Sequence, residues 1–131
     1  MDPVSSFMVA TVKDIDAEIS VKEAAKMLSD FGIGSLLVKK DSEYVGMLSE
    51  QEVTRELVAL GKDPSTTNVG SIMIPDIDYV DQSELMSQAI AIMREKKLPY
   101  LVVRNGENVE GILSVKDLLA YYENWFELTI R

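Results

Sequence analysis

The sequence contains no cysteine and no histidine among its 131 residues. Without cysteine there is no disulfide, no thiol nucleophile and no cysteine-ligated zinc site. Without histidine there is no Ser-His-Asp triad, no histidine-ligated metal site and no imidazole to act as a general base near neutral pH. We therefore expect a protein that is not an enzyme, with no catalytic residues, no metal and no required cofactor.

Long apolar runs and an excess of basic residues are also missing. No run approaches the roughly 20 apolar residues that a membrane-spanning helix needs. The start, MDPVSSFMVATV, lacks the basic and apolar regions of a signal peptide. We expect no membrane association and a cytoplasmic location.

The formal net charge is −9, and the acidic excess is spread evenly along the chain. Residues 1–65 hold 12 acidic and 7 basic residues, and residues 66–131 hold 10 and 6. Extended nucleic-acid binding requires a basic surface. A nucleic-acid partner is therefore not expected.

The sequence repeats itself at an offset of 65 residues. Without a gap over about fifty positions, the offset pairs identical residues and keeps apolar residues opposite apolar ones. Over residues 8–57 the identical pairs are Met8/Met73, Asp16/Asp81, Ala24/Ala89, Leu36/Leu101, Val38/Val103, Gly46/Gly111, Leu48/Leu113 and Ser49/Ser114. We interpret the chain as two copies of one unit.

The first copy shows the order of elements. A capping box at Ser20 and Glu23 begins a helix with apolar residues at helical spacing, which Gly32 ends. Residues 35–40 and 44–48 are β-rich and joined by the polar DSE, which predicts a hairpin. A second helix is expected over residues 49–60. The second copy predicts a helix over residues 84–97, strands at 100–104 and 109–113 around an NGEN turn, and a helix from Ser114.

Each copy therefore has the order β-α-β-β-α, in an α/β fold of the α+β type. We expect unit 1 over residues 1–65, a linker over about residues 61–70, and unit 2 with a C-terminal helix over residues 66–131. A single unit of this size has a marginal core. Two copies can cover each other, so we expect their sheets to pack face to face, with a ligand cleft between the pseudo-symmetric halves.

The segments ISVKEAAKML, IGSLLVKKDSEYVGMLSEQE and LPYLVVRNGENVEGILSVKD resemble the tandem cystathionine-β-synthase (CBS) domain pair, or Bateman module. The resemblance covers residues 8–57 and 73–122. It implies two units related by a pseudo-twofold axis. It also implies a regulatory module that binds AMP, ADP, ATP or S-adenosylmethionine between these units and signals to a partner protein, which the sequence does not identify. A ligand-free dimerisation or interaction scaffold is the alternative.

The resemblance also implies site residues. Asp117 would bind the ribose hydroxyls, and Ser114 and the start of its helix would face the phosphate with Lys116 as an added cation. The base would lie near Val12, Ile33 and Gly34. A weaker second cleft would use the residues Glu52, Ser49, Ile77, Leu98 and Pro99.

Ser-x-x-acid is also a capping box, so Ser49 and Ser114 can be N-caps alone. For Glu52 we favour capping, because its side chain is longer than the usual Asp and Glu50 adds like charge. For Asp117 we favour a ligand role. Lys97 is a minor phosphate candidate.

Two further alternatives concern the C-terminal segment and catalysis. YYENWFELTIR is apolar on more than one face, so it either packs on its own domain or forms a subunit interface. CBS pairs typically dimerise through their helices, and we predict a homodimer. A hydrolase would need a metal site, and the nearest acidic pair, Asp76 and Asp78, has the spacing of an ordinary turn or strand edge.

Overall fold

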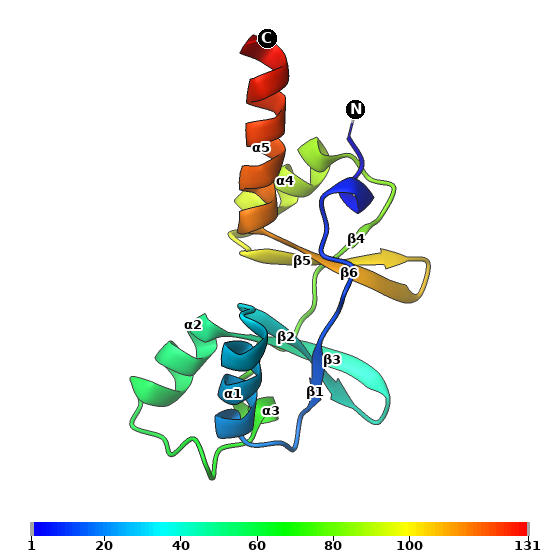
Figure 1. Ribbon diagram of the computed structural model, residues 1–131. Coiled ribbons are helices and arrows are strands. Elements are labelled where there is room, and N and C mark those ends of the chain that lie inside the picture. Colours follow the sequence, from blue (N-terminus) through cyan, green and yellow to red (C-terminus); the bar gives the residue numbers. More distant parts are fainter. Residues whose placement is uncertain (1, 131) are drawn as a thin grey trace. The chain divides into compact units, whose positions relative to one another are not determined.

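The computed structural model describes the backbone of residues 2–130 and the side chains of residues 2–124. The chain divides into two compact units (Figure 1). One, the 13–77 unit, contains residues 13–77. The other, the 78–130 unit, contains residues 78–130 together with residues 2–12.

Each unit contains one three-stranded sheet and its helices, as the repeat predicts. The 13–77 unit contains β1 (Asp14–Asp16), α1 (Val21–Phe31), β2 (Ser35–Lys40), β3 (Glu43–Ser49), α2 (Glu50–Glu52), the π-helix η2 (Val53–Val58) and α3 (Val69–Ile72). The 78–130 unit contains η1 (Val4–Ser6), β4 (Tyr79–Asp81), α4 (Met86–Lys96), β5 (Tyr100–Asn105), β6 (Asn108–Ser114) and α5 (Val115–Ile130). The predicted α+β class is confirmed.

The two sheets share one topology and one irregularity. In each, the first strand is parallel to the second, and the second is antiparallel to the third, in the orders β1-β2-β3 and β4-β5-β6. The register shifts between Val38 and Lys39 in one sheet and between Val103 and Arg104 in the other. These positions differ by 65, so the repeat extends to a β-bulge that the sequence pattern does not reveal.

Helix α1 begins and ends where the sequence predicts. The Ser20 side chain accepts a hydrogen bond from the Glu23 N–H at 3.3 Å, and Gly32 ends the helix in the left-handed region at φ 63°. The other half of the predicted capping box, a bond from the Ser20 N–H to the Glu23 side chain, does not form among the described residues. Buried Val21, Ala24 and Leu28 attach α1 to the core of the 13–77 unit.

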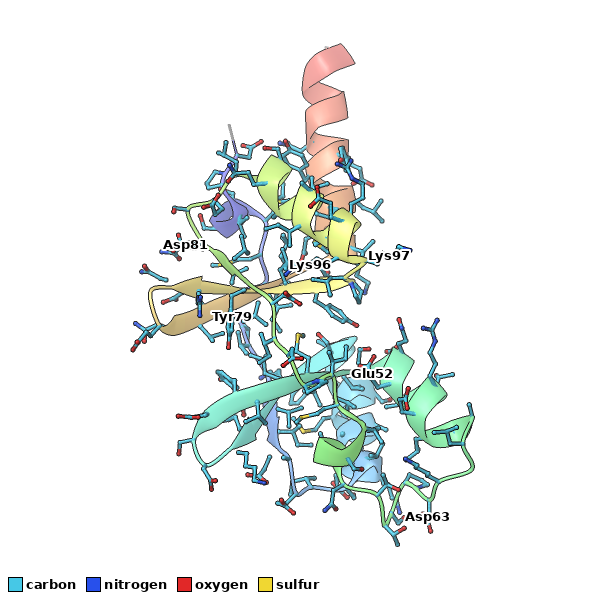
Figure 2. The ribbon with its side chains drawn as sticks, turned by 180° about the vertical axis from the view of Figure 1, so that it is seen from behind. Glu52, Asp63, Tyr79, Asp81, Lys96 and Lys97 are labelled. Atoms are coloured by element: carbon cyan, nitrogen blue, oxygen red, sulfur yellow. The ribbon has the colours of Figure 1, made fainter. Side chains whose placement is uncertain are left out.

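Helix α4 differs at both ends from the predicted 84–97. It begins at Met86 because Asp81–Glu84 forms a turn, in which the Glu84 N–H donates to the Asp81 carbonyl at 3.0 Å. It ends at Lys97, which has a φ of 56° at the position equivalent to Gly32. Figure 2 shows Lys96 and Lys97 at this end of α4. The structure thus gives Lys97 the role of a left-handed C-cap.

The two hairpin turns differ in detail from the predictions. The first turn is Asp41-Ser42, both at positive φ, and Glu43 already belongs to β3. In the second, Asn105 pairs with Asn108. The positive φ there belongs to Gly106, so the turn is shorter than the predicted NGEN.

The helix predicted over residues 49–60 has an unexpected winding. After the short α2, residues Val53–Val58 form a π-helix, in which the Ala59 N–H donates to the Thr54 carbonyl at 2.9 Å. The corresponding part of α5 is an ordinary α-helix. π-Turns are rare and occur frequently at functional sites.

The segment predicted as a linker packs on the 13–77 unit. The Val21 N–H donates to the Thr67 carbonyl at 2.9 Å, and the Val69 N–H donates to the Ile19 carbonyl at 2.8 Å. Val69 begins α3 and is fully buried. Residues 67–70 of the predicted linker therefore belong to the packed structure of the 13–77 unit.

In each unit, a second chain segment crosses the sheet over a glycine. Met47 and Ile74 exchange two backbone hydrogen bonds of 2.9 and 2.8 Å beside Gly46. Val9 and Ile112 exchange two of 2.9 and 3.0 Å beside Gly111. A Cβ on Gly46 would collide with the Ile74 carbonyl oxygen, and one on Gly111 would lie 2.7 Å from that of Val9. The repeated glycine thus permits the close approach of another backbone.

The two crossing segments occupy equivalent positions in the two repeats. Each of them packs on the sheet of the other repeat. Segment 2–12 precedes β1 and packs on the 78–130 unit, where Val4 is fully buried. Segment 69–74 precedes β4 and packs on the 13–77 unit. The repeats in the sequence and the units by packing are therefore divided differently.

Replacement of Gly46 or Gly111 by Ala tests this crossing. We expect each variant to lose about 1–3 kcal/mol of unfolding free energy in urea titration, because the added methyl group overpacks against a backbone oxygen. Gly34→Ala is the matched control, since no atom lies within 4 Å of its added Cβ. Equal stabilities for the Gly34 and Gly46 variants would contradict the steric explanation.

Asp81 provides a pH-dependent contribution to stability. Its carboxylate accepts hydrogen bonds from the Ser83 hydroxyl at 2.6 Å and the Ser83 N–H at 2.9 Å. These bonds, with the positive charge of Arg104, hold the pKa of Asp81 below its ordinary value of 3.8. A depressed folded pKa gives stabilisation that is present above the unfolded pKa and is lost as pH falls through the folded pKa.

We therefore expect Asp81→Asn to flatten the loss of stability below about pH 3.8, measured as unfolding free energy against pH. Ser83→Ala removes the hydroxyl donor alone and is expected to have a smaller effect in the same direction. Parallel curves for Asp81→Asn and the unchanged protein would exclude this contribution.

Candidate functional site

The two Ser-x-x-acid motifs each lie where a third strand passes into a helix. At Ser49, the Glu52 Oε1 atom accepts hydrogen bonds from the Ser49 N–H at 2.6 Å and the Ser49 hydroxyl at 2.7 Å. The Ser49 hydroxyl also accepts from the Gln51 N–H at 3.3 Å. Both side chains are buried, with Glu52 only 7% exposed. The geometry is the capping box that the sequence favours for Glu52.

Asp117 makes the equivalent contacts with a shorter side chain in a more open position. Its Oδ2 atom accepts from the Ser114 N–H at 2.7 Å and the Ser114 hydroxyl at 3.1 Å. Both residues are half-buried, and Lys116 between them is exposed. Among the described residues no hydrogen bond engages Oδ1. Asp117 therefore caps α5 through one oxygen and leaves the other for a further donor.

A backbone carbonyl lies beside each helix start. The Gly34 carbonyl accepts from the Glu50 N–H at 3.2 Å, and the Pro99 carbonyl accepts from the Val115 N–H at 3.2 Å. These pairs are related by the offset of 65. Each loop before a second strand is therefore held against the first turn of the helix that follows the third strand.

Within single units, the structure groups some of the predicted site residues. In the 78–130 unit, Pro99 lies beside the start of α5, which carries Lys116 and Asp117. In the 13–77 unit, Gly34 lies beside the start of α2, which carries Glu52. The remaining predicted positions are half-buried, and they are Val12 and Leu98 in the 78–130 unit and Ile33 and Ile77 in the 13–77 unit.

A pocket of about 400 Å³ lies in the 13–77 unit beside the motif helix. Gln51, Glu52, Arg55 and Glu56 line one side, and Ser71–Pro75 lines the other. A smaller pocket of about 240 Å³ shares Ser71 and Met73 with it and reaches Lys40. Sequence reasoning predicted neither pocket and did not single out Arg55.

Asp76 and Asp78 are the acidic pair considered for a hydrolase metal site. Asp78 pairs with Lys96 at 2.9 Å rather than facing a metal with Asp76. Among the residues the structure describes, no group of three Asp or Glu could hold a metal ion. No described helix has the length and apolarity to cross a membrane.

Helix α5 combines an internal contact with an exposed apolar row. Tyr121 packs edge-on against Phe7, with ring centroids 5.2 Å apart. Val115, Leu119 and Tyr122 are 51%, 61% and 51% exposed, at helical spacings of four and three. The side chains of Trp125, Phe126, Leu128 and Ile130, named in the sequence prediction, lie outside the described residues.

The sequence model of the CBS-domain family matches the chain twice, over residues 4–59 and 69–124. The chain therefore belongs to the CBS-domain family, and its two repeats form a tandem CBS pair.

Solved structures share the fold. A crystal structure of a CBS domain is 31% identical, with a TM-score of 0.86 over 93% of this chain and 98% of that one. A CBS-domain protein from Burkholderia ambifaria is 25% identical, with a TM-score of 0.88 over 92% and 93%. An uncharacterised protein of Thermofilum pendens is 28% identical over 77% of this chain, and the match spans 33% of that protein.

Proposed function

We propose that this tandem CBS pair is a regulatory module that binds an adenine nucleotide or S-adenosylmethionine. The observation that carries the proposal is the difference between the two motifs. Both acids cap through a single oxygen, but Glu52 is buried, whereas Asp117 is half-buried and its Oδ1 has no bond among the described residues. Tandem CBS domains are regulatory modules, and the name of the Burkholderia ambifaria relative suggests signal transduction.

In the proposed site, Asp117 Oδ1 accepts hydrogen bonds from the ribose hydroxyls. Charge-assisted hydrogen bonds of this kind are roughly twice as strong as neutral ones. Ser114 and the first turn of α5 face the phosphate, because a helix start has unpaired N–H groups and a partial positive charge. Lys116 adds a positive charge, and Val12 adds apolar surface in the same unit. The roles of Ile33, Gly34 and the second set with Glu52 stay predictions from the resemblance.

For the module to signal, the ligand must bind one conformation more tightly than another. A ligand with equal affinity for both conformations changes no population. The regulated partner protein would have to recognise the favoured conformation. A cytoplasmic location is part of the proposal.

Isothermal titration with AMP, ADP, ATP and S-adenosylmethionine tests the site. We expect Asp117→Asn to weaken binding at least about tenfold, because the ribose loses a charged acceptor worth about 1.5–3 kcal/mol. Asn retains an oxygen for Ser114, which limits the loss of stability. Asp16→Asn is the matched control, since Asp16 also accepts a backbone N–H, from Glu18 at 2.9 Å. Silence of the unchanged protein with all four compounds would end the proposal.

The exposed row on α5 favours a second function, a homodimeric scaffold. Val115, Leu119 and Tyr122 lie on one side of a helix and are at least half exposed. Apolar side chains in such a row are typical of helix–helix interfaces. A second copy of the chain is the proposed occupant of this row.

Sedimentation measurements test the interface. We expect Leu119→Glu to shift a dimer to monomer, since it places a charge in the middle of the row. Val58→Glu is the control, because Val58 is 66% exposed in the other unit and outside the row. A Leu119→Glu protein that remains dimeric would exclude α5 as the interface.

A further inference from the structure

The 400 Å³ pocket is a property of the 13–77 unit alone. All its lining residues belong to that unit, and its size lies within the range of small-molecule sites. Ile72 is buried, Met73 and Ile74 are half-buried, and they give the pocket an apolar floor. Gln51, Arg55 and Glu56 are exposed, and they form a polar rim.

The π-winding of η2 explains why Glu56 is at the pocket rim. At the offset of 65, Glu56 corresponds to Tyr121, which packs edge to face against Phe7 at 5.2 Å in the 78–130 unit. In the 13–77 unit it is instead Leu57, one residue further along the chain, that is buried in the core with Ile72. The wider π-turn therefore directs Leu57 to the core and leaves the charged Arg55 and Glu56 exposed beside the pocket.

The pocket also carries opposite charges that are not paired with each other. Within the described side chains, neither Arg55 nor Glu56 forms an ion pair or a side-chain hydrogen bond. Glu52, in contrast, is bonded to Ser49 through Oε1. Arg55 and Glu56 both lie in the π-helix η2, a winding that often marks functional sites.

We propose that this pocket binds a small zwitterion with an apolar body, of the apolar α-amino-acid class. The ligand carboxylate would bind the Arg55 guanidinium, whose fork of donors matches a carboxylate. The ligand ammonium would bind Glu56, and the apolar side chain would lie on the floor of Ile72, Met73 and Ile74. With Glu52 and Glu56 both in the lining, a polyphosphate would meet like charge.

The proposal does not depend on nucleotide binding at Asp117. Its first test is titration of the full chain with leucine, methionine and phenylalanine, followed by calorimetry and thermal shift. Leucinamide lacks the carboxylate and N-acetyl-leucine lacks the ammonium group. We expect both derivatives to bind at least tenfold more weakly than leucine. Equal binding of leucine and both derivatives, or no binding of any of the three amino acids, overturns the proposal.

Variants locate the binding. Arg55→Gln and Glu56→Gln are expected to weaken leucine binding at least tenfold, and Arg94→Gln, an exposed arginine on α4 in the other unit, is expected to leave it unchanged. The variant Gln51→Trp places a bulky ring at an exposed lining position of the pocket. It is expected to fold, because the Gln51 side chain is outside the core, and to lose leucine binding. Unchanged leucine affinity in this folded variant would place the site elsewhere and overturn the proposal.

Discussion

The structure depends on two short backbone crossings, each over a glycine. At each, a segment from one repeat exchanges two hydrogen bonds with the third strand of a unit whose sheet belongs to the other repeat. The segment brings apolar side chains with it, such as Val4 and Met8 in one unit and Val69 and Ile72 in the other. A single three-stranded sheet with one or two helices has a marginal core. The crossing segment supplies the missing apolar cover within each unit.

The same crossings hold the strands from which the two motif helices begin. β3 and β6 carry the crossing glycine three residues before the motif serine, so the strand is fixed before it passes into the helix. The serine then caps the helix through an acidic partner. The acidic partner is a buried Glu in one motif and a half-buried Asp in the other, so the two carboxylates differ in how accessible they are to a ligand. Two nearly identical scaffolds thus present different chemistry.

Much of this fold could be predicted because its signals are local or repeated. The Ser20 cap, the Gly32 stop and the strand pairs follow from adjacent residues, and the offset of 65 checks each against its copy. The errors have physical causes. Lys97 occupies a left-handed cap in which its own N–H and that of Leu98 donate to carbonyls of the last turn of α4, a conformation that the sequence favours only for glycine or asparagine. The π-winding of Val53–Val58 and the packing of segment 2–12 on the 78–130 unit depend on distant contacts that no local pattern encodes.

The candidate site could be predicted only in part. Residue type and spacing identified Ser49, Glu52, Ser114 and Asp117 and the capping role of Glu52. The pocket beside Arg55 lies along the π-helix η2, a winding that the sequence pattern does not reveal, so its lining residues could not be grouped from the sequence.

The location of segment 2–12 has a consequence for synthesis on the ribosome, where domains generally fold in order of emergence. The 13–77 unit has all its residues once Ile77 has emerged, whereas the apolar side chains of Val4 and Phe7, though made before that unit, must wait for β6 and α5. Segment 2–12 therefore reaches its packed position only after the unit that follows it in the chain has been made.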